Sequence, residues 1–348
     1  MVVDKVKRDS TIDFVKGLCV LLVIVGHSGV EAGIISKFWY TFYMPAFFIF
    51  SGYLFRYKES IKDTILHKTK SLYVLYLIWA IVPYFILFLI NTVKHFKISK
   101  QYLIVMGKAI VGMELPRLTR QMWFLCTLFT VEMIWILIDK GIKNKKLKVI
   151  AIIVLGLIGV TLNFFDINIP VFRLGTALVF LPVFAFGVLL KRNDNNNLVK
   201  ALTKMNTPLL IVSIFTWLLT SYFHFGVLGY SISASTNGFG MYPLFYFNAI
   251  LGTLIFWNIG RLLVNVTNRV VKTFTNFFVH FGTNSTIVYV TLQIFVVIYK
   301  FIFLSKPVLG ILGQSFASWI ITLFVIISEI FTIKILSNEK FKFLLAKF

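Results

Sequence analysis

The stretch IDFVKGLCVLLVIVGHSGVEAGI, residues 12–34, decides the class of fold. It is long enough to cross a hydrocarbon core about 30 Å thick, which takes about 20 helical residues. Nine further apolar segments predict spans at 38–56, 71–93, 121–139, 147–165, 172–190, 206–224, 243–264, 276–300 and 310–335. We therefore predict an all-α, polytopic integral membrane protein with about ten transmembrane helices, in which residues 1–348 form a single membrane domain.

The composition excludes a soluble protein. Of the 348 residues, 58% are apolar and 14% are charged, whereas a soluble domain carries about 25% charged residues. The net charge of +22 first indicates cytoplasmic loops that follow the positive-inside rule. The lipid bilayer is the predicted partner, and nucleic acid is not.

The distribution of cations predicts the orientation. When the ten spans alternate, most of the 35 Lys and Arg residues fall on the side of the N-terminus, so we expect both termini to be cytoplasmic.

One loop, residues 94–120, departs from this pattern, because it is predicted to be external and yet contains Lys94, Lys97, Lys100, Lys108, Arg117 and Arg120. Its apolar part, Tyr102–Leu115, is too short to cross. Either it is a solvated basic loop, or it is a re-entrant or interfacial segment that lines a site for an anionic group.

The first span holds the ionisable residues Asp13, Lys16 and His27. Such residues are costly in a membrane and indicate function by default. Lys16 and His27 are 11 residues apart, so on a helix they face the same way with a rise of about 16 Å between them. The alternatives are an Asp13–Lys16 pair at the headgroup boundary, snorkelling of Lys16 to the surface, and a His27 that makes only an interhelical hydrogen bond.

Other polar groups give weaker signals. Glu132 and Glu329 lie inside predicted spans. Glu132 either orients a base, holds a positive group, or is protonated and hydrogen-bonded to a neighbouring helix. The five histidines are scattered without the spacing of a zinc site, and the two cysteines lie in apolar runs, so no metal and no disulfide are predicted.

Four motifs in order resemble the membrane acyltransferases of family 3, and within that family the branch of fucose 4-O-acetylases. The first comprises Asp13, Lys16-Gly17 and Gly26-His27, and the second is FYMPAFFIFSGYLF at residues 42–55. The third and fourth are Trp123-Phe124-Leu125 with Leu128-Phe129, and Gly282-Thr283-Asn284-Ser285 with Tyr289.

The resemblance implies an enzyme that moves an acyl group, usually acetyl from acetyl-CoA, onto a sugar hydroxyl of a cell-surface or exported polysaccharide. The family's Arg, ten residues, His pattern matches Lys16 and His27, so a point charge replaces the guanidinium fork. Gln293 stands where the closing block usually has a His, and an amide does not titrate in this range. We therefore assign the chemistry to His27.

The resulting site assignment has three parts. The catalytic residues are His27 and Asp13, and the residues that bind the acetyl-CoA co-substrate are Lys16, Arg56 and Lys58. The residues that bind the glycan acceptor are Trp123, Asn284, Ser285 and Gln293. No permanently bound cofactor is expected. We expect a multi-pass protein in the cell membrane of a bacterium.

Two other classes of function remain open at this stage. One is an exporter of polysaccharide or lipid-linked oligosaccharide without acyl transfer. Inverted repeats with broken helices would favour an exporter, and we find no such repeats in the sequence. The other is a membrane receptor or assembly subunit without chemistry, which gives His27 no special role.

Overall fold

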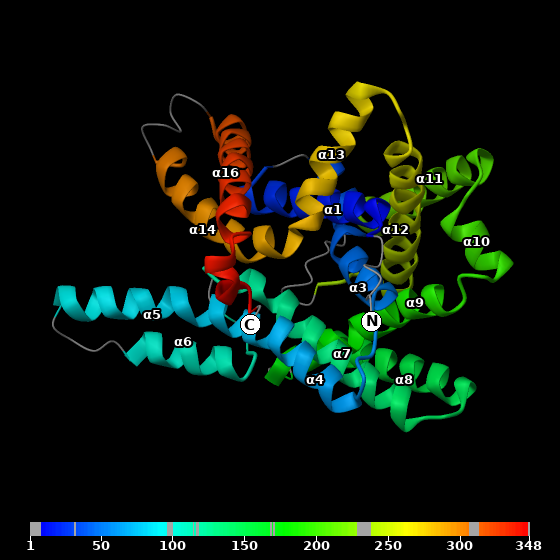
Figure 1. Cartoon of the computed structure of the whole chain (residues 1–348), viewed down its shortest axis with the longest axis horizontal. Helices are drawn as coiled ribbons and strands as arrows, with labels where there is room; N and C mark the ends of the chain where they lie inside the picture. Colours follow the sequence, from blue (N-terminus) through cyan, green and yellow to red (C-terminus); the bar gives the residue numbers. More distant parts are fainter. Residues whose placement is uncertain are drawn as a thin grey trace.

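The structure, a computed structural model, describes residues 8–30, 33–95, 100–113, 115, 118–167, 169, 171–227, 238–305 and 313–346. It has helices and no β-strand among these residues (Figure 1). The helices are α1 (Ser10–Ser28), α2 (Ile34–Tyr40), α3 (Tyr43–Tyr53), α4 (Ile61–Lys68), the π-helix η1 (Thr69–Val74), α5 (Leu75–His95), α6 (Lys100–Ile110), η2 (Arg120–Met122), α7 (Trp123–Gly141), α8 (Lys145–Phe164), η3 (Val171–Arg173), α9 (Leu174–Arg192), α10 (Asn197–Thr203), α11 (Thr207–Tyr222), η4 (Phe223–Val227), α12 (Tyr242–Val264), α13 (Arg269–Thr283), α14 (Ser285–Phe303), α16 (Gln314–Leu336) and η6 (Glu339–Leu345).

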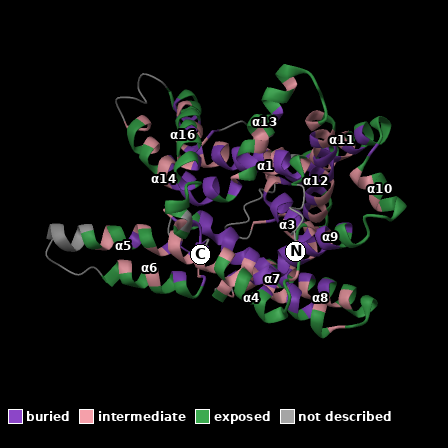
Figure 2. Ribbon diagram, viewed as in Figure 1, coloured by how far each residue is buried: buried purple, intermediate pink, exposed green. Residues whose placement is uncertain are grey.

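The prediction of a polytopic all-α membrane protein is confirmed. Within the described residues, nine helical stretches are long and apolar enough to cross a membrane: Ser10–Ser28, Ile61–Leu89, Arg120–Gly141, Lys145–Phe164, Val171–Arg192, Thr207–Phe225, Tyr242–Val264, Ser285–Phe303 and Gln314–Leu336. Their outward faces carry large apolar side chains, such as Phe301 at 85% exposure and Phe215 at 68%. Figure 2 shows these exposed faces around a buried centre. Hydrocarbon is the solvent that such a surface fits.

The prediction of one continuous helix at 38–56 is wrong. The chain forms α2 and α3 there, with a break at Thr41–Phe42. Thr41 closes the end of α2, because its backbone N–H and its hydroxyl both donate to the Phe38 carbonyl at 3.2 and 2.7 Å. Pro45 then lies in the first turn of α3, where its missing N–H costs no hydrogen bond. Hydropathy does not register this break because both halves are apolar.

The predicted span 276–300 also has wrong boundaries. Asn284 separates α13 from α14, and its side-chain amide donates to the His280 carbonyl at 2.9 Å. This capping bond ends α13, so the crossing helix is Ser285–Phe303 and α13 is a separate element.

The segment 94–120 contains a helix, α6, that packs along α5 (Figure 1). Carbonyls at and just after its end accept from other elements: Tyr76 donates to Ala109 O at 2.8 Å, and the Phe172 N–H donates to Val111 O at 2.9 Å. Leu103 and Ile104 are exposed. Lys97 and Arg117, two of the cations of this segment, lie outside the described residues.

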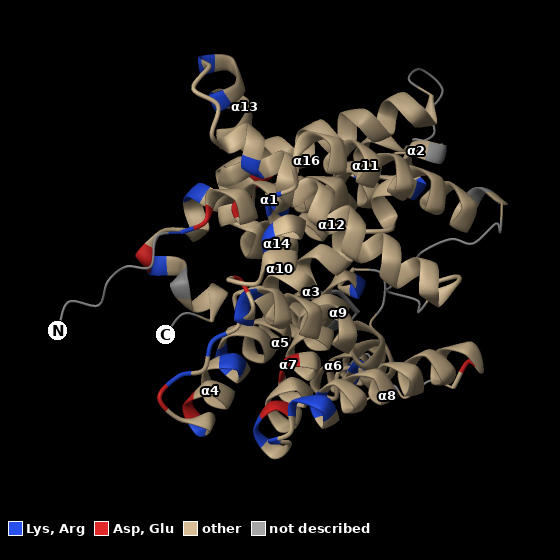
Figure 3. Cartoon of the chain, turned by 90° about the vertical axis from the view of Figure 1, so that its right-hand side faces the viewer, with Lys and Arg blue, Asp and Glu red and all other residues tan. Residues whose placement is uncertain are grey.

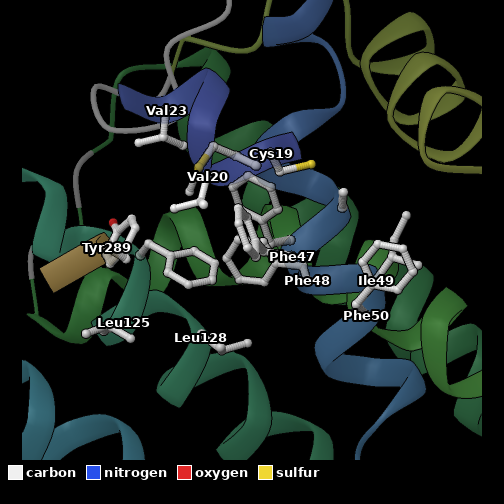
Figure 4. Packing of buried hydrophobic residues seen from close by; sticks show 14 of the residues in the cluster. Cys19, Val20, Val23, Phe47, Phe48, Ile49, Phe50, Leu125, Leu128 and Tyr289 are labelled. Carbon is white, nitrogen blue, oxygen red and sulfur yellow. The ribbon is translucent and has the colours of Figure 1, made fainter. Parts of the chain in front are cut away.

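The helix α1 lies at the centre of the packing, against α3, α12, α13, α14 and α16. It approaches α13 so closely that a Cβ on Gly17 would lie 1.8 Å from the Phe278 carbonyl oxygen, and one on Gly282 would lie 1.6 Å from the Asp13 carbonyl oxygen. Small residues allow such backbone contact in membranes. Phenylalanine rings of α3 and the side chains of Leu125 and Leu128 of α7 fill the adjoining core (Figure 4). The motif that contains Lys16-Gly17 and the motif that begins at Gly282 therefore meet where α1 crosses α13.

Most of the charged residues gather at one end of the bundle, where α1 begins and η6 ends (Figure 3). We call this the charged end.

Candidate active site

A cavity of about 460 Å³ opens at the charged end between the start of α1, the end of α3 and the end of α9. Its polar lining consists of four cations, two carboxylates and a phenol: Arg8, Lys16, Arg56, Lys191, Asp9, Asp13 and Tyr53. The excess of cations suits an anionic ligand.

Asp13 organises the part of the cavity that α1 contributes. Its carboxylate is buried and pairs with the Arg8 guanidinium. Lys16 Nζ lies 3.9 Å from Asp13 Oδ1, and the Thr283 hydroxyl donates to Oδ2 at 3.5 Å. Arg8 also donates to the Thr283 carbonyl at 3.1 Å. Asp13 and Lys16 therefore do pair, and Lys16 faces the cavity as well.

Arg56 and Lys58, the two predicted donor-binding residues after α3, differ in where they lie. Arg56 lines the cavity, but the described lining residues do not include Lys58. Lys58 is exposed, and its backbone N–H donates to the Thr64 hydroxyl at 2.9 Å.

His27 lies in the last turn of α1 and is half-buried. The Gln293 and Lys300 side chains of α14 lie near its ring. The Tyr40 hydroxyl is also near, 3.3 Å from the position that a Cβ on Gly26 would take. The ring thus lies where α1, α2 and α14 meet.

The described residues that line the cavity do not include His27. It follows Lys16 by 11 residues, a rise of about 16 Å, and Asp13 by 14 residues, a rise of about 21 Å. Asp13 and His27, the predicted catalytic pair, therefore occupy opposite ends of one helix and do not touch.

The predicted acceptor-binding residues fall into three places. Asn284 and Ser285 lie at the junction of α13 and α14, next to Thr283, which contacts Asp13. Gln293 lies about 14 Å further along α14 beside His27, and its buried Oε1 has no hydrogen-bond partner among the described residues. Trp123 begins α7 and packs against Phe124 and Phe180 with ring centroids 6.2 and 6.0 Å away. Only Gln293 is thus brought to His27.

The two carboxylates whose roles the sequence left open have distinct partners. Glu132 is buried and pairs with Lys68, whose Nζ lies 3.0 Å from the carboxylate. Glu329 is buried in α16 and accepts from the Thr291 hydroxyl at 2.9 and 2.8 Å. Glu132 thus holds a positive group. Over the part of the chain that the structure describes, no group of three His, Cys, Asp or Glu side chains is placed to hold a metal ion.

Sequence analysis did not assign four of the polar residues that line the cavity, namely Arg8, Asp9, Tyr53 and Lys191. Arg8 and Lys191 were counted only as cytoplasmic cations, because a cation next to a span predicts a side of the membrane and no direction for the side chain. Tyr53 could have been assigned from the sequence, because it lies inside the second family-like motif, directly after Ser51-Gly52.

The fold and this cavity define a class of protein: a multi-pass membrane protein that combines a cationic cavity with an embedded histidine on its first helix. The chain matches the acyltransferase domain of family 3 over residues 9–333. It therefore belongs to that family and is a membrane acyltransferase. No curated protein and no solved structure matches it significantly.

Proposed function

We propose that the protein transfers an acetyl group from acetyl-CoA to a sugar hydroxyl of a cell-surface or exported polysaccharide, as the resemblance to fucose 4-O-acetylases suggests. The whole chain acts as one membrane domain in the bacterial cell membrane, with the charged end and both termini in the cytoplasm. The observation that carries this proposal is the cation-lined cavity at the end of the same helix that bears His27.

The donor binds with its polyanionic end in the cavity. Lys16 and Arg56 contact phosphate oxygens, since charge-assisted hydrogen bonds to phosphate are strong. Asp13 keeps Lys16 and Arg8 in position by its ion pairs. The pantetheine arm extends along α1 and brings the thioester toward His27.

The chemical step uses His27 as a general base. Its ring takes the proton of the sugar hydroxyl while the oxygen attacks the thioester carbonyl and a carbon–oxygen bond forms. The tetrahedral intermediate then breaks its carbon–sulfur bond, and the CoA thiolate takes the proton back from His27. Gln293 orients the ring and accepts a hydrogen bond from the sugar through its Oε1. Asn284, Ser285 and Trp123 are the further acceptor contacts that we propose.

Membership of the acyltransferase family favours acyl transfer over polysaccharide export. The test uses purified protein in liposomes with radiolabelled acetyl-CoA and polysaccharide extracted from a strain that lacks the gene. We expect label on the polysaccharide, with labelled palmitoyl-CoA as the comparison donor. Movement of polysaccharide across the liposome membrane without label transfer supports the exporter, and label from palmitoyl-CoA alone refutes the acetyl donor.

A further inference from the structure

Asp139, near the end of α7, is the centre of a network at the charged end that the proposed chemistry does not use. Its side chain is 6% exposed and receives hydrogen bonds from the segment after α3, from α8 and from α9. The Tyr57 hydroxyl donates at 2.9 Å, Lys148 Nζ of α8 at 2.7 Å, and Arg192 of α9 through both terminal nitrogens at 2.9 and 2.7 Å.

Two of these three partners are sequence neighbours of cavity cations. Tyr57 follows Arg56, and Arg192 follows Lys191, and both Arg56 and Lys191 line the cavity. Lys148 differs, because α8 contributes no residue to the described lining. One carboxylate thus ties together two walls of the cavity that come from segments far apart in the sequence.

The contacts around the network restrict both walls. Lys140 Nζ lies 4.1 Å from the centroid of the Tyr57 ring, and Phe55 packs edge-on against that ring at 5.2 Å. Burial, together with the hydrogen bond to Asp139, raises the pKa of Tyr57, so its hydroxyl stays a donor at neutral pH. The bidentate geometry of Arg192 fixes a direction as well as a distance.

We propose that Asp139 is a positioning residue that holds the segment carrying Arg56 and the end of α9 carrying Lys191 at the spacing that the phosphates of the acyl donor require. It acts through Tyr57 and Arg192 and touches no substrate. This role rests on the proposed binding of acetyl-CoA in the cavity.

The first test compares Tyr57→Phe and Arg192→Lys with Lys148→Met. The first two keep ring or charge but lose the bonds that hold a cavity wall, whereas the third removes a partner of Asp139 from a helix outside the cavity. We expect Tyr57→Phe and Arg192→Lys to raise the KM for acetyl-CoA about twofold each, with kcat unchanged, and Lys148→Met to leave KM unchanged. An equal rise in all three variants, or in none, overturns the proposal.

A second measurement does not depend on the donor. A spin label on Leu54→Cys reports on the wall after α3, since Leu54 lines the cavity and is 48% exposed, while Cys19 and Cys126 are buried. We expect Tyr57→Phe to increase the mobility of the label and Lys148→Met to leave it unchanged. If wild-type protein does not bind acetyl-CoA, the proposed function fails. If the label is equally immobile with Tyr57→Phe, the positioning role fails.

Discussion

The two ends of α1 differ in surroundings and in the task that each can perform. At its first turns, Asp13 and Lys16 border a cavity of about 460 Å³ with three further cations. At its last turn, His27 is surrounded by neighbouring helices and meets the Gln293 amide. The first environment is a charged cavity that suits a large anionic group, whereas the second is a half-buried ring among packed helices.

This difference indicates how a membrane enzyme can separate binding from chemistry. A rigid helix keeps Lys16 and His27 on one face with about 16 Å between them. A donor that is polyanionic at one end and reactive at the other fits that separation. Variants at the two ends of α1 should therefore change different kinetic constants.

The largest expected effect is a loss of stability when the close packing of α1 against α13 is disrupted. Gly17→Ala places a Cβ 1.8 Å from the Phe278 carbonyl oxygen, and a backbone atom cannot rotate away as a side chain can. We expect a loss of about 3 kcal/mol of stability, measured as a lower thermal unfolding midpoint of the detergent-solubilised protein. Gly107→Ala is the matched control, because a Cβ there meets nothing within 4 Å. Equal midpoints for the two variants contradict the close crossing.

The next effect belongs to the charged end. Lys16→Met removes a cation from the cavity, and we expect the KM for acetyl-CoA to rise about tenfold while kcat changes little. Lys16→Arg keeps the charge and should keep most of the affinity. Initial rates over a range of donor concentrations measure both constants. A Met variant with the donor KM of wild type indicates that Lys16 only snorkels.

A smaller effect, on kcat and not on KM, is expected at the His27 end of α1. Gln293→Leu removes the amide near the His27 ring and puts an apolar side chain of similar size in the buried site. We expect kcat to fall about fivefold with the donor KM unchanged, determined in the same rate measurements. A rise in donor KM without a change in kcat refutes the division between the two ends.

The smallest effect separates neighbouring cations. Arg56 lines the cavity and Lys58 does not, although both are exposed. Exposed charges contribute little, so we expect Arg56→Met to raise the donor KM about threefold and Lys58→Met to leave it unchanged. Equal effects of the two substitutions indicate that the general positive charge of this end, and not the cavity, attracts the donor.

Sequence predicted the helical class and most spans because hydropathy reports directly on lipid exposure. It missed the breaks at Thr41–Phe42 and Asn284, where the ends of helices depend on local hydrogen bonds inside apolar runs. The common face of Lys16 and His27 followed from helical periodicity. The lining role of Lys191 did not, because that role depends on how α9 packs beside α3.

The division of α1 into a binding end and a reacting end is tested most directly by the His27→Ala variant, with donor binding and transfer measured on the same preparation. Titration calorimetry with acetyl-CoA should give the affinity of wild type, because the cavity at the charged end is intact. Transfer of labelled acetyl to polysaccharide should fall by about 100-fold or more, since the general base is gone. Full transfer activity in His27→Ala, or a loss of acetyl-CoA binding equal to the loss of transfer, contradicts the division.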